Sequence, residues 1–368
     1  MNALSGAIAE RGHTDLLVQS LAGVWRVLPP AEPLPVAQLA KHTAQLLESG
    51  VGGLVWRRLV LADADGRDGL RALEQAYRID ALKALWHEGQ IADLFECLGA
   101  RGIDAVLCKG WSVARIYPET SLRPYNDIDL VIAPGRLPDA VRMLEETAGK
   151  GAQVDLHRSV PDLKADDWGG VLLRSRVIPL GHSPVRILGA EDQLRQLCLH
   201  FWRHLGCRPL WLCDVGAALE AAAPTFDWDY CLRGKPAVAD TILCVLGLAM
   251  QLLQAQATPE IAARAGRLPG WLVPAVLWRW SSGMVVGPLW SYCRDWNGLA
   301  QAMLFKKFNP MRATERMRLS PHESLLAIQA ASLCGRPLQY GVRLWRRLKK
   351  KFAPRSDQAF DVHEDRVF

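Results

Sequence analysis

The sequence lacks several patterns that would assign it to a particular protein class. Its nine cysteines include no C-x-x-C pair, which argues against a site built from paired cysteines. Some of them, such as Cys108 and Cys244, lie within apolar runs, so we expect reduced, buried thiols and a cytoplasmic protein. Residues 1–30 have no basic start followed by an apolar core and a small-residue cleavage site, so no signal peptide is predicted.

Long hydrophobic runs, internal repeats and strong net charge are also missing. The longest apolar segment, Thr241 to Leu253, is shorter than the roughly 20 residues that span a bilayer, so we expect a buried helix there. Half of the 368 residues are apolar and 22% are charged, as in globular proteins. The net charge of +6 is compatible with a phosphate-bearing substrate, but it does not require nucleic acid, and no specific nucleic-acid partner is expected.

The residues that suggest chemistry lie between positions 104 and 157. An apolar run, Ala105–Cys108, ends at Lys109-Gly110, as a short buried strand ends in a turn before a helix. Backbone N–H groups at such a turn attract phosphate, glycine allows close approach, and a lysine can pair with a phosphate oxygen. We therefore predict that Lys109, Gly110 and Ser112 contact a nucleotide phosphate.

Acidic and apolar residues alternate in the next predicted strand, residues 126–132. Alternation on a strand places Asp127 and Asp129 on the same face. Asp155 lies in a third short strand, Val154–His157, which follows a second helix. Acids within apolar strands are costly unless they have partners. We therefore predict that the three carboxylates converge to bind divalent metal and act as catalytic residues.

Taken together, these motifs resemble the bacterial uncharacterised nucleotidyltransferase family of the polymerase-β-like superfamily. The resemblance rests on the combination of LCKG, YP, an arginine, DIDLVI and VDLH, and it covers approximately residues 40 to 260. It implies an α+β fold, with a small mixed-sheet core flanked by N-terminal helices and a C-terminal helical domain. One departure is Trp111, which follows Gly110 where the superfamily usually has a second glycine or a serine.

The resemblance implies an enzyme that transfers a nucleotidyl group, AMP from ATP, to a hydroxyl or phosphate of a small-molecule, glycan or peptide acceptor. Such a reaction uses two Mg²⁺ ions. Asp127 and Asp129 would hold both ions, and Asp155 would ligate one and accept the proton of the attacking hydroxyl. The alternative is a non-catalytic nucleotide-binding or scaffold protein, which the Gly110-Trp111 turn favours and the three acids disfavour.

Two further residues near the acids are predicted to contact the nucleotide. Arg123, four residues before Asp127, could clamp the β- or γ-phosphate, and a solvated surface charge is the alternative. His157 falls on the same strand face as Asp155. It could orient that carboxylate or contact a phosphate, and a structural histidine is the alternative.

His200 and His204 lie four residues apart, and therefore on one face of a helix predicted over residues 191–205. Such a pair could bind zinc, but no glutamate lies between them and the nearby cysteines lack paired spacing. In the family, a similar pair of helices with two histidines and an aspartate, here Asp214, follows the core. The resemblance implies that these residues line the nucleotide cleft, with His200 or His204 near Asp127 and Asp155, and structural histidines are the alternative.

The chain is predicted to have four parts: a helical segment over residues 1–100, an α/β core over 101–188, a helical domain over 189–300 and a basic tail over 301–368. A long helix from Gly69 to Gly99 would bury a stripe made of Leu73, Tyr77, Leu82, Leu85, Ile91, Leu94 and Phe95. β-rich pieces between Trp168 and Ile187 would extend the sheet or form a hairpin. The stretch Arg343–Phe352 could contact an anionic membrane, dock onto the protein or stay solvated.

Overall fold

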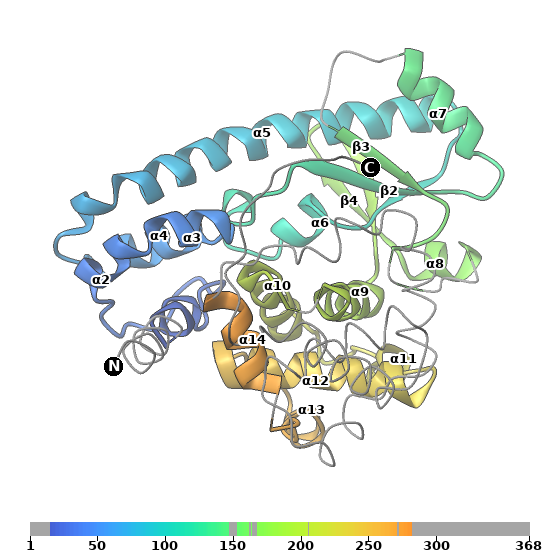
Figure 1. The fold of residues 1–368 in the computed structure, drawn as a ribbon. Coiled ribbons are helices and arrows are strands. Elements are labelled where there is room, and N and C mark those ends of the chain that lie inside the picture. The colour runs from blue at the N-terminus through green and yellow to red at the C-terminus, as the bar shows by residue number, and fades with distance from the viewer. Residues whose placement is uncertain are drawn as a thin grey trace, which may run out of the picture.

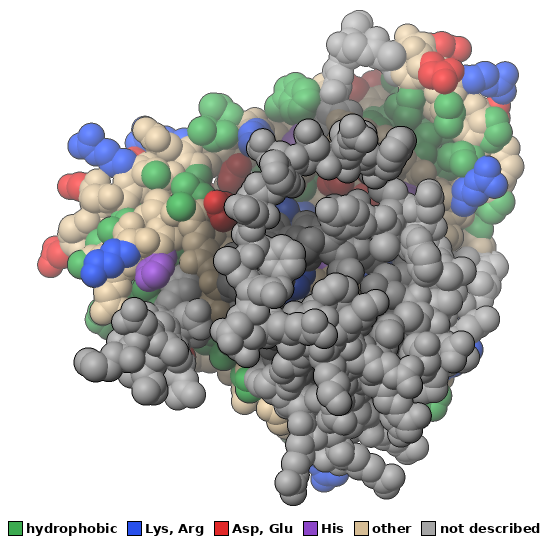
Figure 2. Space-filling model, viewed as in Figure 1, with side chains coloured by type: hydrophobic (Ala, Val, Ile, Leu, Met, Phe, Trp, Pro, Cys, Tyr) green, Lys and Arg blue, Asp and Glu red, His purple; other side chains and the backbone are tan. Residues whose placement is uncertain are grey.

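The computed structural model describes residues 15–146, 153–161, 163, 168–204, 206–270 and 272–281. A long helix runs along one side of a mixed sheet, and most of the later helices gather on the opposite side of the molecule (Figure 1). The predicted basic tail, Arg343–Phe352, lies outside the described residues. Over the described parts of the face in Figure 2, acidic and basic side chains are interspersed.

The sheet has five strands in the order β3-β2-β1-β5-β4. Their bounds are β1 Ala105–Leu107, β2 Asp127–Ile132, β3 Gln153–His157, β4 Arg176–Leu180 and β5 Ser183–Ile187. β1 is antiparallel to β2 and parallel to β5, while β2 is parallel to β3. β4 and β5 form an antiparallel hairpin, and β5 joins it to β1. The predicted α+β fold with a mixed sheet is therefore confirmed. The β-rich pieces after residue 168 form a hairpin, and this hairpin extends the sheet.

The helices are arranged around this sheet in three groups. Those before it are α2 Val36–Lys41, α3 Thr43–Glu48, α4 Gly52–Leu61, η1 Arg67–Leu70 and α5 Arg71–Ala100. Those that connect its strands along the chain are α6 Trp111–Ala114, η2 Thr120–Leu122, α7 Leu137–Glu146 and α8 Trp168–Arg174. Those after it are α9 Ala190–Arg203, α10 Pro209–Glu220, α11 Trp228–Cys231, α12 Pro236–Leu253, α13 Pro259–Ala265 and α14 Leu272–Ser281.

Local sequence explains several of the helix ends. α10, α12 and α13 each begin at a proline, whose fixed φ suits the first helical turn and whose missing N–H would have no helical partner there. The Thr258 hydroxyl accepts a hydrogen bond from the backbone N–H of Ile261 and so caps α13. α5 ends just before Gly102, which has a positive φ of 61°.

The long helix α5 buries most of the predicted stripe. Leu73, Ile91, Leu94 and Phe95 are buried as predicted, and Ala84 is buried with them. Leu82 and Leu85 are 70% and 67% exposed, so this part of the prediction was wrong. Periodicity alone could not separate the two faces, because apolar residues occur on both. Packing against α4 and then against the sheet selects the face that is buried.

Three hydrophobic clusters of buried residues hold the described part of the molecule together. One lies between α5 and the sheet, where Leu98, Leu107 and Ile128 meet. The largest unites helices from both flanks of the sheet, with contributions that include Leu21, Trp25, Leu54, Leu199, Leu212 and Val245. The helical segments predicted separately before residue 100 and after residue 189 thus share one core. The segment boundaries themselves stay a prediction.

α12 is an apolar helix that contributes many residues to this largest cluster. It is 18 residues long, five longer than the apolar segment predicted over Thr241–Leu253, and by length and composition alone it could cross a membrane. More than half of it is buried against other helices, and its buried residues include Ile242, Val245 and Leu248. The core helix of a globular protein passes the same test, so this finding is weak evidence for a membrane span.

Candidate functional site

The three predicted acids, Asp127, Asp129 and Asp155, meet at the β2–β3 side of the sheet. Asp129 lies directly opposite Asp155 in the parallel pairing of β2 and β3. Asp127 precedes Asp129 by two residues and shares its face. One carboxylate oxygen from each side chain lies within 4.8 Å of those of the other two. Among the described residues, this is the one group of acidic, histidine or cysteine ligands with a spacing suited to a metal ion.

Asp129 is the most enclosed of the three acids, at 4% exposed. His157 Nε2 lies 2.8 Å from its Oδ1, and Lys109 Nζ lies 3.6 Å from the same atom. Burial alone would raise the pKa of this carboxyl. The hydrogen bond to His157 and the charges of Lys109, His157 and His200 outweigh burial and hold the pKa of Asp129 below its ordinary value. Asp129 is therefore an ionised carboxylate even though it is buried.

Asp127 has the opposite electrostatic environment. Burial, followed by repulsion from Asp129 and Asp155, raises its pKa, and Lys109 offsets only part of this effect. A bound cation would reduce the repulsion among these three carboxylates, one of which is held ionised. Mg²⁺ prefers oxygen ligands, and this donor set contains only oxygen. The residues therefore fit a hard divalent cation such as Mg²⁺.

The predicted phosphate turn depends on glycine at position 110. Gly110 has a φ of 60° and precedes α6. A Cβ atom here would lie 3.0 Å from the Tyr125 ring and 3.3 Å from the carbonyl oxygen of Asp127. Other residues would be strained by both the backbone conformation and these neighbours. The close approach brings the turn directly against the strand that carries Asp127 and Asp129.

Trp111, the departure from the superfamily pattern, does not occupy the turn. Its indole is buried in the cluster between α5 and the sheet, and its Nε1 donates a 3.1 Å hydrogen bond to Glu88 of α5. α6 has only four residues, so a helix dipole would contribute little to phosphate binding. Lys109 and the backbone of the turn are the groups that remain near the acids.

Ser112, which was predicted to contact phosphate, is fully buried. Its hydroxyl donates to the carbonyl oxygen of Lys109 at 3.2 Å. Gln193 of α9 donates to both the carbonyl oxygen and the hydroxyl of Ser112, at 3.0 and 3.3 Å. These contacts support a structural role that ties α9 to the turn. A phosphate contact by Ser112 stays a prediction that its burial does not favour.

Arg123 is paired within the protein, and its contact with a phosphate stays a prediction. Its Nη2 donates to Asp214 Oδ2 at 2.9 Å, and its Nε lies 3.2 Å from both oxygens of the same carboxylate. Tyr117 donates a further 2.8 Å bond to Asp214 Oδ1. All three side chains are buried. Arg123 is thus engaged in an ion pair between the α/β core and α10, and Asp214 belongs to the interior and does not line a cleft.

Of the three predicted histidines, His157 lies on β3, and His200 and His204 lie at the C-terminal end of α9. His157 does orient a carboxylate, but the carboxylate is Asp129, because β3 pairs in a register that places Asp155 opposite Asp129. His200 lies close enough to lower the pKa of Asp129 through its charge. It also packs against His204 and Trp211, with ring centroids 4.6 Å from each. That His200 or His204 lies near Asp127 and Asp155 stays a prediction.

Sequence reasoning missed a second set of polar residues beside the acids. His87 of α5 and Tyr125 before β2 stack with ring centroids 4.8 Å apart and planes 28° from parallel. Tyr125 precedes Asp127 by two residues, and both approach Gly110, which places this set next to the triad. The available signal was that Asp80 and His87, seven residues apart, share the face of α5 marked by Leu73 and Ile91.

The fold and the acidic cluster first define a class: an α+β protein with a potential divalent-metal site on a mixed sheet. Residues 38–254, more than half of the chain, match the family described as uncharacterised nucleotidyltransferase. The chain therefore belongs to this uncharacterised nucleotidyltransferase family, and the resemblance inferred from its motifs is confirmed. No curated protein matches it.

One solved structure shows a partial likeness. It is described as an antigenic nucleotidyltransferase-like protein from Paracoccidioides brasiliensis, with 16% sequence identity and a TM-score of 0.36. The alignment covers 49% of this chain and 92% of that one. The low TM-score means that this likeness has no bearing on the function of the present protein.

Proposed function

We propose that this protein is a Mg²⁺-dependent nucleotidyltransferase that transfers AMP from ATP to a hydroxyl or phosphate of a small-molecule, glycan or peptide acceptor. The observation that carries the proposal is the convergence of Asp127, Asp129 and Asp155 within 4.8 Å of one another. Membership of the nucleotidyltransferase family supports a nucleotide substrate.

Each residue near the triad would have a distinct role. Asp127, Asp129 and Asp155 would hold Mg²⁺, which when bound neutralises phosphate charge and polarises the reacting phosphoryl group. Lys109, half-buried at 3.6 Å from Asp129, can direct its ammonium group toward a phosphate oxygen. His157 orients Asp129 through its hydrogen bond. Asp155 would accept the proton of the acceptor hydroxyl.

The non-catalytic alternative depended on Trp111, which replaces a small residue next to the phosphate turn. The indole is directed into the core and held there by Glu88, so it does not weigh against nucleotide binding. Asp127, whose pKa is raised by burial and by two neighbouring carboxylates, has an energetic cost that a scaffold would have no reason to retain. The catalytic function is therefore better supported.

Calorimetric titration of the full-length protein with each of the four nucleoside triphosphates, with and without Mg²⁺, tests the proposal. We expect Mg²⁺-dependent binding of at least one of them, ATP first. Residues that only support metal ligands typically change affinity by about 10–100-fold, so Asp129→Asn should weaken binding by about 100-fold or more. Asp93→Asn, at an exposed carboxylate on α5, is the matched control and should leave binding unchanged. Binding that is independent of Mg²⁺, or equal in Asp129→Asn, would contradict the proposed function.

A further inference from the structure

The long helix α5 carries an apolar face that is open to solvent. Its members, which are between 49% and 70% exposed, are Ile79, Leu82, Leu85 and Trp86. They follow one another at spacings of three and four residues, so they lie together on one side of the helix. Single exposed apolar residues are normal, but a contiguous set marks an interaction surface. We call this set the outer α5 face.

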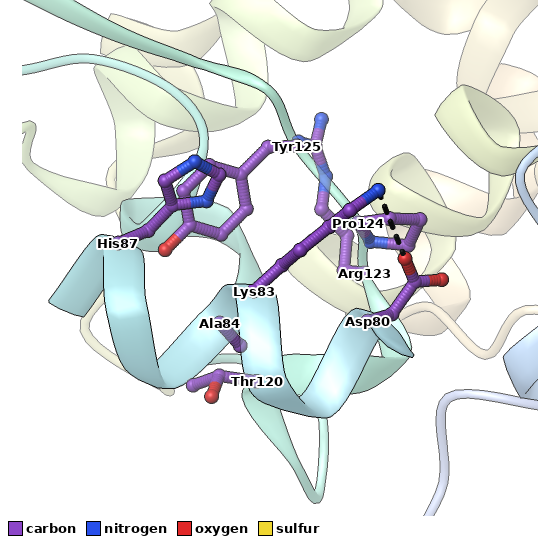
Figure 3. Close-up of a pocket in the computed structure, with 8 residues that line it drawn as sticks. All are labelled: Asp80, Lys83, Ala84, His87, Thr120, Arg123, Pro124 and Tyr125. Carbon is purple, nitrogen blue, oxygen red and sulfur yellow. Dashed lines mark ion pairs between the residues drawn. The ribbon is translucent and has the colours of Figure 1, made fainter. Parts of the chain in front are cut away.

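The opposite side of α5 already packs within the protein. α4, η2 and β5 contact the helix, and Figure 1 shows α5 along one side of the molecule with α4 and the sheet on its inner side. At the middle of this inner side, Ala84 and His87 face the chain that carries Tyr125 (Figure 3). Lys83 and Asp80 offset each other there, with 4.0 Å between the ammonium nitrogen and a carboxylate oxygen. The outer α5 face is therefore available for a partner.

Charged residues on α5 have opposite signs at the two ends of the outer α5 face. Before it come Arg71 and Arg78, which are both exposed and form its basic end. After it come Asp93 and Glu96, whose side chains are 67% and 68% exposed and form its acidic end. The apolar centre thus lies between a basic and an acidic end, and the partner has to match both.

Neither end is neutralised by its neighbours in the chain. At the basic end, Arg78 pairs with Glu74 at 2.6 Å, but this single carboxylate lies beside two arginines. At the acidic end, His182 Nε2 lies 3.6 Å from Asp93 and 3.2 Å from Glu96, so one imidazole is shared by two carboxylates. Net positive and net negative charge remain at the respective ends.

An antiparallel pairing of two copies of α5 matches the apolar centre and both ends. Arg71 and Glu96 both lie about 18–20 Å from the position of Ala84, in opposite directions, because each helical residue rises 1.5 Å. A two-fold axis beside Ala84 therefore brings the apolar faces together and places the basic end of one copy against the acidic end of the other. A parallel pairing would place Arg78 beside Arg78 and Asp93 beside Asp93, and like charges repel.

Two other occupants match the ends less well. An anionic membrane would be repelled by Asp93 and Glu96 at the acidic end. The segment Arg343–Phe352 is amphipathic, but all its charges are positive, so it would match the acidic end and be repelled at the basic end. A second copy of the chain carries both signs in complementary order.

We propose that the outer α5 face is the contact surface of a homodimer in which two copies of α5 pack antiparallel. Interfaces at the small end of the range, below about 1,200 Å² in total, are generally transient. A single helix face is a small interface, so the dimer should dissociate on dilution. This pairing does not depend on the proposed nucleotidyl transfer.

Sedimentation velocity of the full-length protein over about 1–100 µM tests the dimer. We expect the mass to rise with concentration from 40.8 kDa toward twice that value. Leu82→Glu places a charge in the apolar centre and should weaken association at least about tenfold. Leu173→Glu is the matched control, because Leu173 is an 87% exposed leucine on α8, and it should associate like the wild type. A monomer at every concentration, or equal association of Leu82→Glu, would overturn the proposal.

Melting temperatures in dilute solution show whether Leu82→Glu acts on association or on folding. Leu82 is 70% exposed, so the variant should melt within about 2 °C of the wild type. A melting temperature many degrees lower would place Leu82 in the packing of the single chain and overturn the proposal.

Charge exchange tests the antiparallel order. Arg71→Glu combined with Arg78→Glu makes both ends negative and should weaken the dimer. Asp93→Lys combined with Glu96→Lys makes both ends positive and should also weaken it. All four substitutions together restore opposite signs, so this variant should associate more tightly than either double variant. Absence of that rescue would overturn the antiparallel pairing.

Cross-linking and vesicle binding separate a second copy from the other occupants. An amine-reactive link between Lys83 and Lys83 requires two copies and would support the dimer. A link within the monomer from Lys83 to a lysine at positions 349–351 would assign the outer α5 face to the chain's own basic segment and overturn the proposal. Binding to phosphatidylserine vesicles that Leu82→Glu abolishes would assign the face to a membrane and also overturn it.

Discussion

Two clusters of carboxylates and cations in this molecule are built from similar residues, yet they differ in how completely the charges are satisfied. Asp214 receives hydrogen bonds from Arg123 and Tyr117 in the buried interface with α10. Asp129 has a hydrogen bond with His157 and an ion pair with Lys109, but it also lies beside two further carboxylates at the sheet. The first cluster is closed and balanced, whereas the second retains excess negative charge.

The difference shows how a buried carboxylate can serve either stability or binding. Asp214 has a bidentate cation and a phenol, so its charge is compensated within the protein. The raised pKa of Asp127, caused by burial and then by Asp129 and Asp155, indicates that compensation at the triad is incomplete. An added cation would bring the triad to the same balanced state. Four experiments test this contrast.

The largest effect is expected from opening the closed cluster. Asp214→Ala leaves the Arg123 guanidinium buried without its partner, which typically costs about 3–5 kcal/mol of unfolding free energy. Glu146→Ala removes an exposed partner of Arg101 and should cost about 1 kcal/mol or less. Urea denaturation of both variants measures the difference. Similar losses would show that burial of the Arg123 pair has no special importance.

The next effect concerns the glycine that brings the phosphate turn against the acids. Gly110→Ala should lose about 2–3 kcal/mol of stability, from its positive φ and from contact with Tyr125 and the Asp127 carbonyl. Gly102→Ala is the matched control, because Gly102 has a similar φ of 61° with no atom within 4 Å of the added Cβ. It should lose about 1 kcal/mol. Equal losses in denaturation would mean that the close approach at Gly110 is readily relieved.

A smaller effect, with opposite signs, is expected within the triad. In metal-free buffer at neutral pH, Asp129→Asn should cost about 1–2 kcal/mol, because it weakens a charged hydrogen bond with His157. Asp127→Asn should be neutral or stabilising by less than about 1 kcal/mol, since it removes a repelled charge. Thermal melts with a chelator present compare the two variants. A stability loss in Asp127→Asn as large as that in Asp129→Asn would contradict the electrostatic difference.

The smallest effect is the pH dependence of this pair of variants. The folded-state pKa of Asp127 is raised, so its ionisation penalises folding at neutral pH, and the penalty disappears as pH falls below the ordinary value of 3.8. The pKa of Asp129 is lowered, so its stabilisation is present above 3.8 and is lost as pH falls through the folded-state pKa. Melting temperatures of the two variants should therefore converge with the wild type toward acid pH. Differences that stay constant with pH would show that ionisation is not their cause.

The central part of the site could be predicted from the sequence because it depends on local backbone geometry. Alternation in a strand requires Asp127 and Asp129 to share a face, and the short turn required glycine at position 110. Asp155, an acid within the next short strand, was predicted to join them because acids within apolar strands need partners. The proposed catalytic role of these residues stays a prediction that the binding and turnover experiments address.

The rest depended on contacts between residues far apart in the chain. The sequence alone determined which residues alternate, turn and form helices, since those preferences involve neighbours. Only the tertiary structure decided that Arg123 meets Asp214, 91 residues later, and that His87 stacks on Tyr125. It also decided that Leu82 faces outward, because α5 has apolar residues on two faces and packing can bury only one. Long-range packing selects among partners that local patterns leave equivalent.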